Sequence, residues 1–160
     1  MEKGIRAESL LLDYGDSILR MAYSYLHNLQ DAEDILQETL IRYLKSAPDF
    51  ESTGHEKAWL LRVAANLSKN RVRHNQIRAH DELKEELVSE RKEELGHVWD
   101  AVKELPEIYR EVIHLFYQEE YSTRQIAELL SLPESTVRVR LNRGRKRLKK
   151  VLKEEYDFGE

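Results

Sequence analysis

The chain contains no cysteine, and only three of its 160 residues are proline and six are glycine. Without cysteine, neither a disulfide framework nor a cysteine-based zinc site can form. Alternation of apolar and polar residues is nearly absent outside one basic segment, which argues against a strand-rich fold. Charged residues make up 35% of the sequence, so we expect a water-soluble, all-α protein.

The signatures of several functional classes are also missing. The six histidines show no metal-ligand spacing, and the sequence has no glycine-rich phosphate loop and no nucleophile elbow. We therefore expect no metal, no cofactor and no enzymatic activity. Neither a signal peptide nor an apolar run of membrane-spanning length is present. The expected location is the cytoplasm, without insertion into a membrane.

The most informative segment is residues 121–150, YSTRQIAELLSLPESTVRVRLNRGRKRLKK, which predicts two helices separated by a short turn. Ser122 or Thr123 can cap the first helix, and Pro133 cannot continue it. In the second helix a narrow apolar stripe is expected to face the core. That stripe consists of Val137, Leu141, Gly144, Leu148 and Val151.

The other side of the second helix is cationic. Residues 135–153 contain nine lysines or arginines and no acid, although the whole chain has a net charge of −4. Such a pair of helices is typical of a helix-turn-helix whose second helix enters the major groove. A solvated basic helix at the end of a bundle is the alternative. The turn, the glycine in the packing stripe and the one-signed outer face favour binding to nucleic acid.

The N-terminal half predicts further helices. Residues 6–26 form one helix or two, because Gly15 can mark a break. The next helix is expected to begin at about Asp31, as its N-cap, and to be closed by Pro48. Its acidic start, DAEDILQE at residues 31–38, fits either helix capping or a binding face.

A third helix is expected at residues 56–73, with an apolar side and an opposite side of basic and amide residues. Such a face suits phosphates and base edges, with a solvated surface as the alternative. The polar segment 75–92 is predicted to be a flexible linker between small helical domains at 5–74 and 93–155. The second domain adds helices near 95–105 and 107–116 beneath the helix-turn-helix.

Four segments together resemble the extracytoplasmic-function (ECF) sigma factors, the small bacterial sigma subunits that direct RNA polymerase to promoters. They are DAEDILQETLIRYL (31–44), AWLLRVAANLSKNRVR (58–73), LPEIYREVIHL (105–115) and YSTRQIAELLSLPESTVRVRLNRGRKRL (121–148). The resemblance implies a sigma-2 domain and a sigma-4 domain without a third domain between them. The implied partners are core RNA polymerase, through the clamp helices of its largest subunit and the flap of its second-largest, promoter DNA, and an anti-sigma factor that can hold the protein at the membrane.

The resemblance also implies roles for individual residues. The residues implied to dock on the clamp helices are Asp31, Asp34, Gln37 and Glu38. Those implied to read the −10 element are Arg62, Asn66, Lys69, Asn70 and Arg73. The loop implied to capture a flipped base contains Phe50, Ser52, Thr53, Gly54 and His55. The residues implied to face the −35 element are Arg138, Val139, Asn142 and Arg143. Those assigned to DNA phosphates are Arg124, Ser135, Thr136, Arg140 and Lys146.

Two other functions account for part of the pattern. An ordinary dimeric regulator that binds a palindrome would need a dimerisation surface, and no heptad seam is evident. A helical adaptor whose basic faces hold an acidic protein would leave the turn between the last two helices unexplained. The sequence therefore favours the sigma-factor interpretation over both alternatives.

Overall fold

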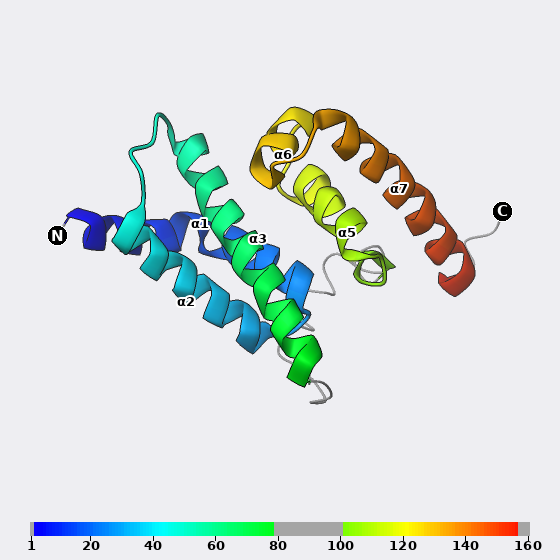
Figure 1. The fold of residues 1–160 in the computed structure, drawn as a ribbon, viewed down its shortest axis with the longest axis horizontal. Helices are drawn as coiled ribbons and strands as arrows, with labels where there is room; N and C mark the ends of the chain where they lie inside the picture. The colour runs from blue at the N-terminus through cyan, green and yellow to red at the C-terminus, as the bar shows by residue number, and fades with distance from the viewer. Residues whose placement is uncertain (1, 79–100, 157–160) are drawn as a thin grey trace. The chain divides into compact units, whose positions relative to one another are not determined.

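The computed structural model describes residues 2–78 and 101–156. Within these ranges the chain is helical and contains no strand, which confirms the predicted all-α class. It divides into two compact units, Met1–Lys84 and Glu85–Glu160 (Figure 1). Most of the predicted linker and the start of the helix expected near residue 95 lie outside the described residues. None of the described helices combines the length and hydropathy that a membrane crossing requires.

The N-terminal unit consists of α1 (Glu2–Leu26), α2 (Leu29–Ser46) and α3 (Thr53–Arg78), and each helix packs against the other two. Their facing sides bury large apolar residues, which drives the association of the helices. These residues are Leu10, Ile18, Met21, Ile35, Leu60 and Leu61. Helix α1 runs through Gly15 without the break that was considered possible. One glycine costs a helix only about 1 kcal/mol, which burial on both sides of it outweighs.

The start of α2 differs from the sequence prediction. The N-cap is Asn28, whose side chain accepts a hydrogen bond of 2.8 Å from the backbone N–H of Asp31. Asp31 is therefore already inside the helix, and its assignment as the N-cap was wrong. His27 takes a left-handed φ of 54°, so the chain reverses between α1 and α2 over two residues. This leaves the Asp31 carboxylate available to another helix.

Helix α3 is longer than predicted at both ends. It begins at Thr53 instead of residue 56, because the side chain of Ser52 accepts the backbone N–H of His55 at 3.1 Å. It ends at Arg78, so the predicted domain end at residue 74 falls inside the helix. Its last turns therefore belong to the N-terminal unit.

The C-terminal unit contains a helical segment at residues 101–103, α5 (Glu107–Ile113), η2 (His114–Gln118), α6 (Thr123–Leu130) and α7 (Glu134–Tyr156). Helix α7 packs against both α5 and α6. The buried side chains at their junction are Val112, Ile113, Leu115, Ile126, Val137 and Leu141. Gly144 is also buried, so the predicted packing stripe is confirmed from Val137 to Gly144, while its last two members, Leu148 and Val151, are only half-buried.

The predicted helix-turn-helix is confirmed in its local chemistry. Ser122 caps α6 in a capping box with Gln125, two reciprocal bonds that satisfy free N–H groups at the helix start. The helix ends at Ser131 in the left-handed conformation, with φ of 58°. Pro133 directly precedes α7, and its carbonyl accepts the N–H of Val137. The turn therefore fixes where α7 begins.

The π-helical turn η2 was not predicted. The backbone N–H of Glu119 bonds to the carbonyl of His114 at 3.2 Å, one residue further back than in an α-helix. The two side chains are buried and lie together, with His114 Nε2 3.4 Å from Glu119 Oε2. The extra residue widens the last turn and directs Tyr117 to the surface, where it is 52% exposed.

Candidate nucleic-acid interface

The outward side of α7 carries the residues predicted to face the −35 element. All four, Arg138, Val139, Asn142 and Arg143, are exposed. Val139 is 45% exposed, so its apolar side chain lies on this outward side of the helix. Because Val137 and Leu141 of the same helix are buried, α7 presents these four residues on one continuous face.

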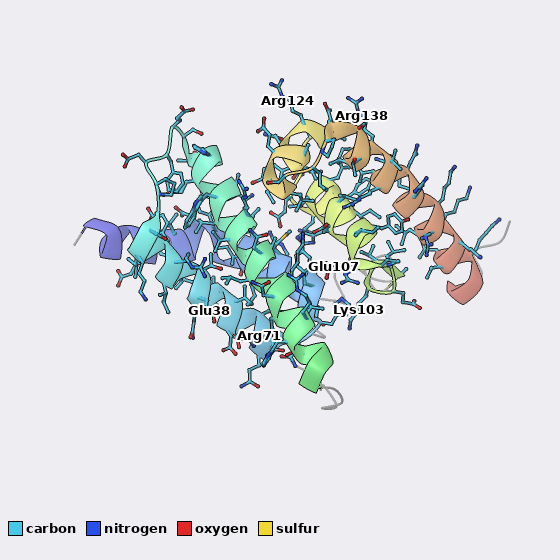
Figure 2. All side chains as sticks on the ribbon, viewed as in Figure 1. Glu38, Arg71, Lys103, Glu107, Arg124 and Arg138 are labelled. Carbon is cyan, nitrogen blue, oxygen red and sulfur yellow. The ribbon has the colours of Figure 1, made fainter. Side chains whose placement is uncertain are left out.

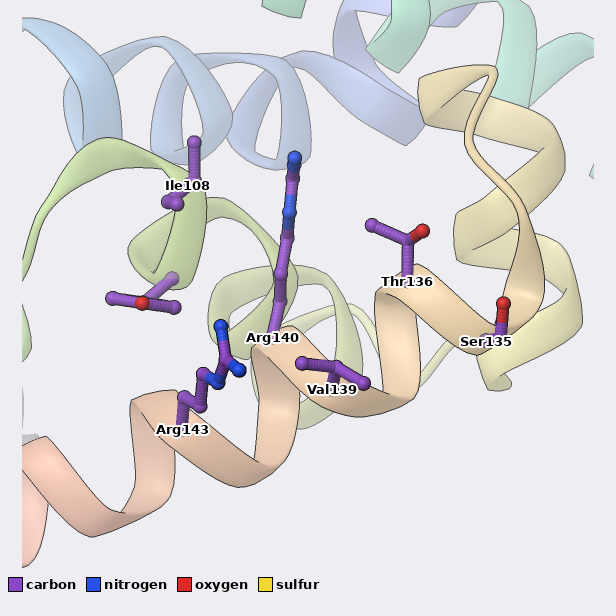
Figure 3. A pocket seen from close by; sticks show the side chains of 7 residues that line it. Ile108, Ser135, Thr136, Val139, Arg140 and Arg143 are labelled. Carbon is purple, nitrogen blue, oxygen red and sulfur yellow. The ribbon is translucent and has the colours of Figure 1, made fainter.

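Several of the predicted contact residues meet at an open groove of about 360 Å³ beside the first half of α7. The residues from α7 that line it are Ser135, Thr136, Val139, Arg140 and Arg143, shown in Figure 3. The opposite wall is formed by Ile108 and Tyr109 of α5. These two residues were not predicted to lie near the site, and only the packing of α5 on α7 brings them there. The groove thus joins predicted base-reading and phosphate-binding residues.

A network of three side chains spans the turn between α6 and α7. The hydroxyl of Thr123 donates to Glu134 Oε2 at 2.7 Å, and Arg138 donates to the same oxygen at 2.9 Å. The bond from Thr123 and the guanidinium of Arg138 hold the pKa of the Glu134 carboxyl below its ordinary value. Since the pKa is lowered, the carboxylate stays ionised at neutral pH, and the network is lost only as pH falls into the acid range. This role of Glu134 was not predicted, although its i,i+4 spacing from Arg138 indicates such a pair.

Other cations of α7 contact α5 and η2 instead of facing outward alone. Arg140 is half-buried and lies 3.9 Å from the carboxylate of Glu111, which is 3% exposed. The Nε–H of Arg145 donates to the Tyr117 hydroxyl at 2.7 Å. Arg140, predicted to bind a phosphate, therefore also neutralises a buried acid of the same unit.

The predicted −10 residues lie along α3. Arg62, Asn66, Asn70 and Arg73 are exposed, as the faces of this helix predicted. Lys69 is half-buried, with its Nζ 5.9 Å from the centroid of the Tyr25 ring. The basic face of α3 is thus continuous, but Lys69 lies at its edge, against α1.

The predicted flipped-base segment is only partly a loop. Thr53, Gly54 and His55 belong to the first turn of α3, while Phe50 lies before the helix and is half-buried. The Phe50 ring stacks on Tyr43 at 6.3 Å between centroids and meets the edge of Trp59 at 5.8 Å. Phe50 is therefore fixed in an aromatic cluster, and the exposed members of the segment are Ser52, Thr53, Gly54 and His55.

The residues of α2 that were predicted to dock on the clamp helices form two groups. Asp34, Gln37 and Glu38 are exposed, and Glu38 is labelled on α2 in Figure 2. Asp31 instead receives hydrogen bonds from α3, from Arg71 at 3.1 Å and Asn75 at 3.2 Å. Arg71 also lies 3.7 Å from Asp34, so it joins the acidic start of α2 to the last turns of α3.

Replacing Arg71 by alanine should lower the free energy of unfolding by about 1–3 kcal/mol, the usual loss when a hydrogen bond to a charged group is removed. The side chains of Arg71 and Asp31 are only 25% and 24% exposed, so water replaces the lost bond poorly. Urea unfolding followed by circular dichroism measures the change. Arg42→Ala, on the exposed side of α2, is the matched control and should change stability by no more than about 0.5 kcal/mol. Equal effects of the two variants would contradict a structural role for Arg71.

No group of three or more histidine, aspartate or glutamate side chains in residues 2–78 and 101–156 is arranged to hold a metal ion. What the described residues offer is a cationic face on each of two helices, an exposed acidic face on a third, and a groove beside the turn.

Each of the two helical units matches a known family of protein regions. The family description "Sigma-70 region 2" matches residues 10–77, and "Sigma-70, region 4" matches residues 96–148. The ECF RNA polymerase sigma factor SigW of Bacillus subtilis is 33% identical, over 88% of this chain and 86% of that protein. RNA polymerase sigma factor SigV of the same organism is 30% identical, over 97% of this chain and 98% of that protein.

A solved structure shares the fold. It is the sigma factor RpoE from Bartonella quintana in complex with the anti-sigma factor NepR, with a TM-score of 0.70 at 23% identity, over 92% of this chain and 97% of that one. The two matched regions, the near full-length identity to SigW and the shared fold lead to one conclusion. The chain belongs to the ECF family of RNA polymerase sigma factors.

Proposed function

We propose that this sigma factor binds core RNA polymerase through the exposed acidic face of α2 and directs initiation at promoters that its two basic helices recognise. Asp34, Gln37 and Glu38 contact the clamp helices of the largest subunit. Asp31 holds α2 against α3, because its carboxylate accepts hydrogen bonds from Arg71 and Asn75. The C-terminal unit contacts the flap of the second-largest subunit.

In this proposal α3 reads the −10 element and α7 reads the −35 element. The observation that carries the −35 assignment is the groove beside α7, where base-reading and phosphate-binding candidates adjoin. Val139 has no hydrogen-bonding side-chain group, so it reads a thymine methyl or the local shape of the DNA. Arg124 of α6 and Lys146 of α7 are both exposed. In this proposal each of them contacts a DNA phosphate.

At the −10 element, a base flipped out of the opened strand is captured by Ser52, Thr53, Gly54 and His55. The neighbouring aromatic cluster keeps Phe50 in place. Extruding a base costs a few kcal/mol, which contacts with the polymerase and with these residues must offset. With Trp59 as the one aromatic residue on this part of α3, we propose that opening depends strongly on a good match to the promoter.

We further propose that an anti-sigma factor controls the protein. The support is the matched structure of a sigma factor bound to an anti-sigma factor, whose sigma chain shares this fold along nearly its whole length. Through such a partner the protein would be held away from the polymerase until it is released.

The experiment that tests the function is transcription by purified core polymerase on pooled promoter fragments, with and without this protein. We expect selective initiation from a subset of fragments that share a −35 and a −10 sequence. If the protein has no effect on core polymerase but binds a palindrome tightly by itself, it is an ordinary dimeric regulator and the proposal is wrong.

A further inference from the structure

Two members of the network of Thr123, Glu134 and Arg138 have no role in the function proposed above, which uses only Arg138, at the −35 element. Glu134 is the first residue of α7, and a single carboxylate oxygen accepts both the Thr123 hydroxyl and the Arg138 guanidinium. An acid this close to a DNA-reading surface reduces attraction to phosphates. Glu134 nevertheless lies beside Arg138, so we expect it to have a function that outweighs the weaker attraction to phosphates.

The position of Arg138 explains what the acid does. Its side chain is 66% exposed, and an arginine in that setting has many rotamers and reaches phosphates as easily as bases. Arg138 projects with Arg124 from the end of the unit where α6 meets α7 (Figure 2). The carboxylate one turn earlier holds the guanidinium at 2.9 Å, and the hydroxyl of α6 holds the carboxylate at 2.7 Å.

We propose that Glu134 is a specificity-determining positioning residue, which holds Arg138 for contact with a base and keeps it from phosphates. Thr123 has the supporting role, since its hydroxyl fixes the carboxylate from the neighbouring helix. The same arrangement makes α6 part of the recognition surface, although α6 itself does not enter the groove. This inference rests on the proposed reading of the −35 element by α7.

The test uses holoenzyme made from core polymerase and the full chain. Competition binding compares a promoter fragment, the same fragment changed at the −35 base pair that loses discrimination in Arg138→Ala, and a random-sequence duplex. Glu134→Gln should lower the ratio of matched to mismatched affinity about 3–10-fold, part of the loss expected when a bidentate contact disappears. It should raise affinity for the random duplex about two- to fivefold, because one negative charge near the phosphates is removed.

Two further variants separate positioning from a general effect on α7. Thr123→Val keeps the charge of Glu134, so it should lower the matched-to-mismatched ratio without raising affinity for the random duplex. In an Arg138→Ala background, Glu134→Gln should no longer change the ratio. The inference is overturned if Glu134→Gln lowers both affinities equally, or if it lowers the ratio as much at −35 base pairs whose discrimination Arg138→Ala leaves intact.

These outcomes are distinct from a failure of the proposed function. If holoenzyme with the unaltered protein shows no preference among −35 sequences, the −35 assignment is wrong and this inference falls with it. If the unaltered protein discriminates and Glu134→Gln discriminates equally well, only the positioning role of Glu134 is wrong. Circular dichroism of each variant establishes that α7 has kept its helical content.

Discussion

Gly144→Val should strongly destabilise the C-terminal unit. A Cβ atom built on Gly144 would lie 2.8 Å from Ile113 Cδ1 and 3.2 Å from Tyr109 Cβ, both in α5. Ile113 is only 1% exposed, so it has nowhere to move, and the Cβ of Tyr109 is fixed to the backbone. Overpacking of this kind costs about 1–3 kcal/mol. Thermal unfolding by circular dichroism, with hydrogen exchange of α5 and α7 to localise the effect, measures it.

The matched control is Gly15→Ala in the N-terminal unit. There a Cβ atom would meet only Leu11, at 3.3 Å from Cδ1, and that side chain is 46% exposed and can move. Alanine is better than glycine inside a helix by about 1 kcal/mol, so this variant should be more stable than the unaltered protein. If Gly144→Val melts like the unaltered protein, α5 and α7 are not in the close contact described above.

Arg143→Ala should remove discrimination at one base pair of the −35 element. Arg143 lines the groove with Val139 and is exposed, a position suited to a bidentate contact with guanine. Such a contact is worth about 1–3 kcal/mol, or about 5–150-fold in preference for the correct base. Initiation by reconstituted holoenzyme on a library of −35 variants gives the preference at each position.

Lys146→Ala is the control for that measurement. Lys146 is also exposed on α7 but is assigned to a phosphate, so its loss should weaken initiation about equally on all sequences. If both variants change the profile in the same way, Arg143 contacts the backbone and its assignment to a base is wrong.

The helix-turn-helix could be predicted from the sequence because its determinants are local. The cap at Ser122, the break at Pro133 and the apolar stripe through Gly144 all act within one or two turns of a helix. The exposed face of α7 then follows from a period of 3.6 residues. The same logic located the buried and exposed sides of α3.

The errors arose where a distant residue decides the outcome. Asp31 fits the composition of an N-cap, but Asn28 takes that position, and Asp31 bonds to Arg71, forty residues further along the chain. No local pattern contains that pairing. No sequence pattern announced the π-turn at His114–Gln118 either. Phe50 is held by rings from two helices, Tyr43 of α2 and Trp59 of α3, which is a tertiary effect.

The contacts made by α7 also change how its charge should be counted. DNA binding releases about 0.9 counterions for each phosphate that a protein neutralises. Two arginines of α7 already meet acids within their own unit, Arg138 with Glu134 and Arg140 with Glu111. The formal charge of this helix therefore overstates the number of ions that it can displace from a promoter. The affinity of this helix for DNA should therefore fall less steeply with salt concentration than nine cations would predict.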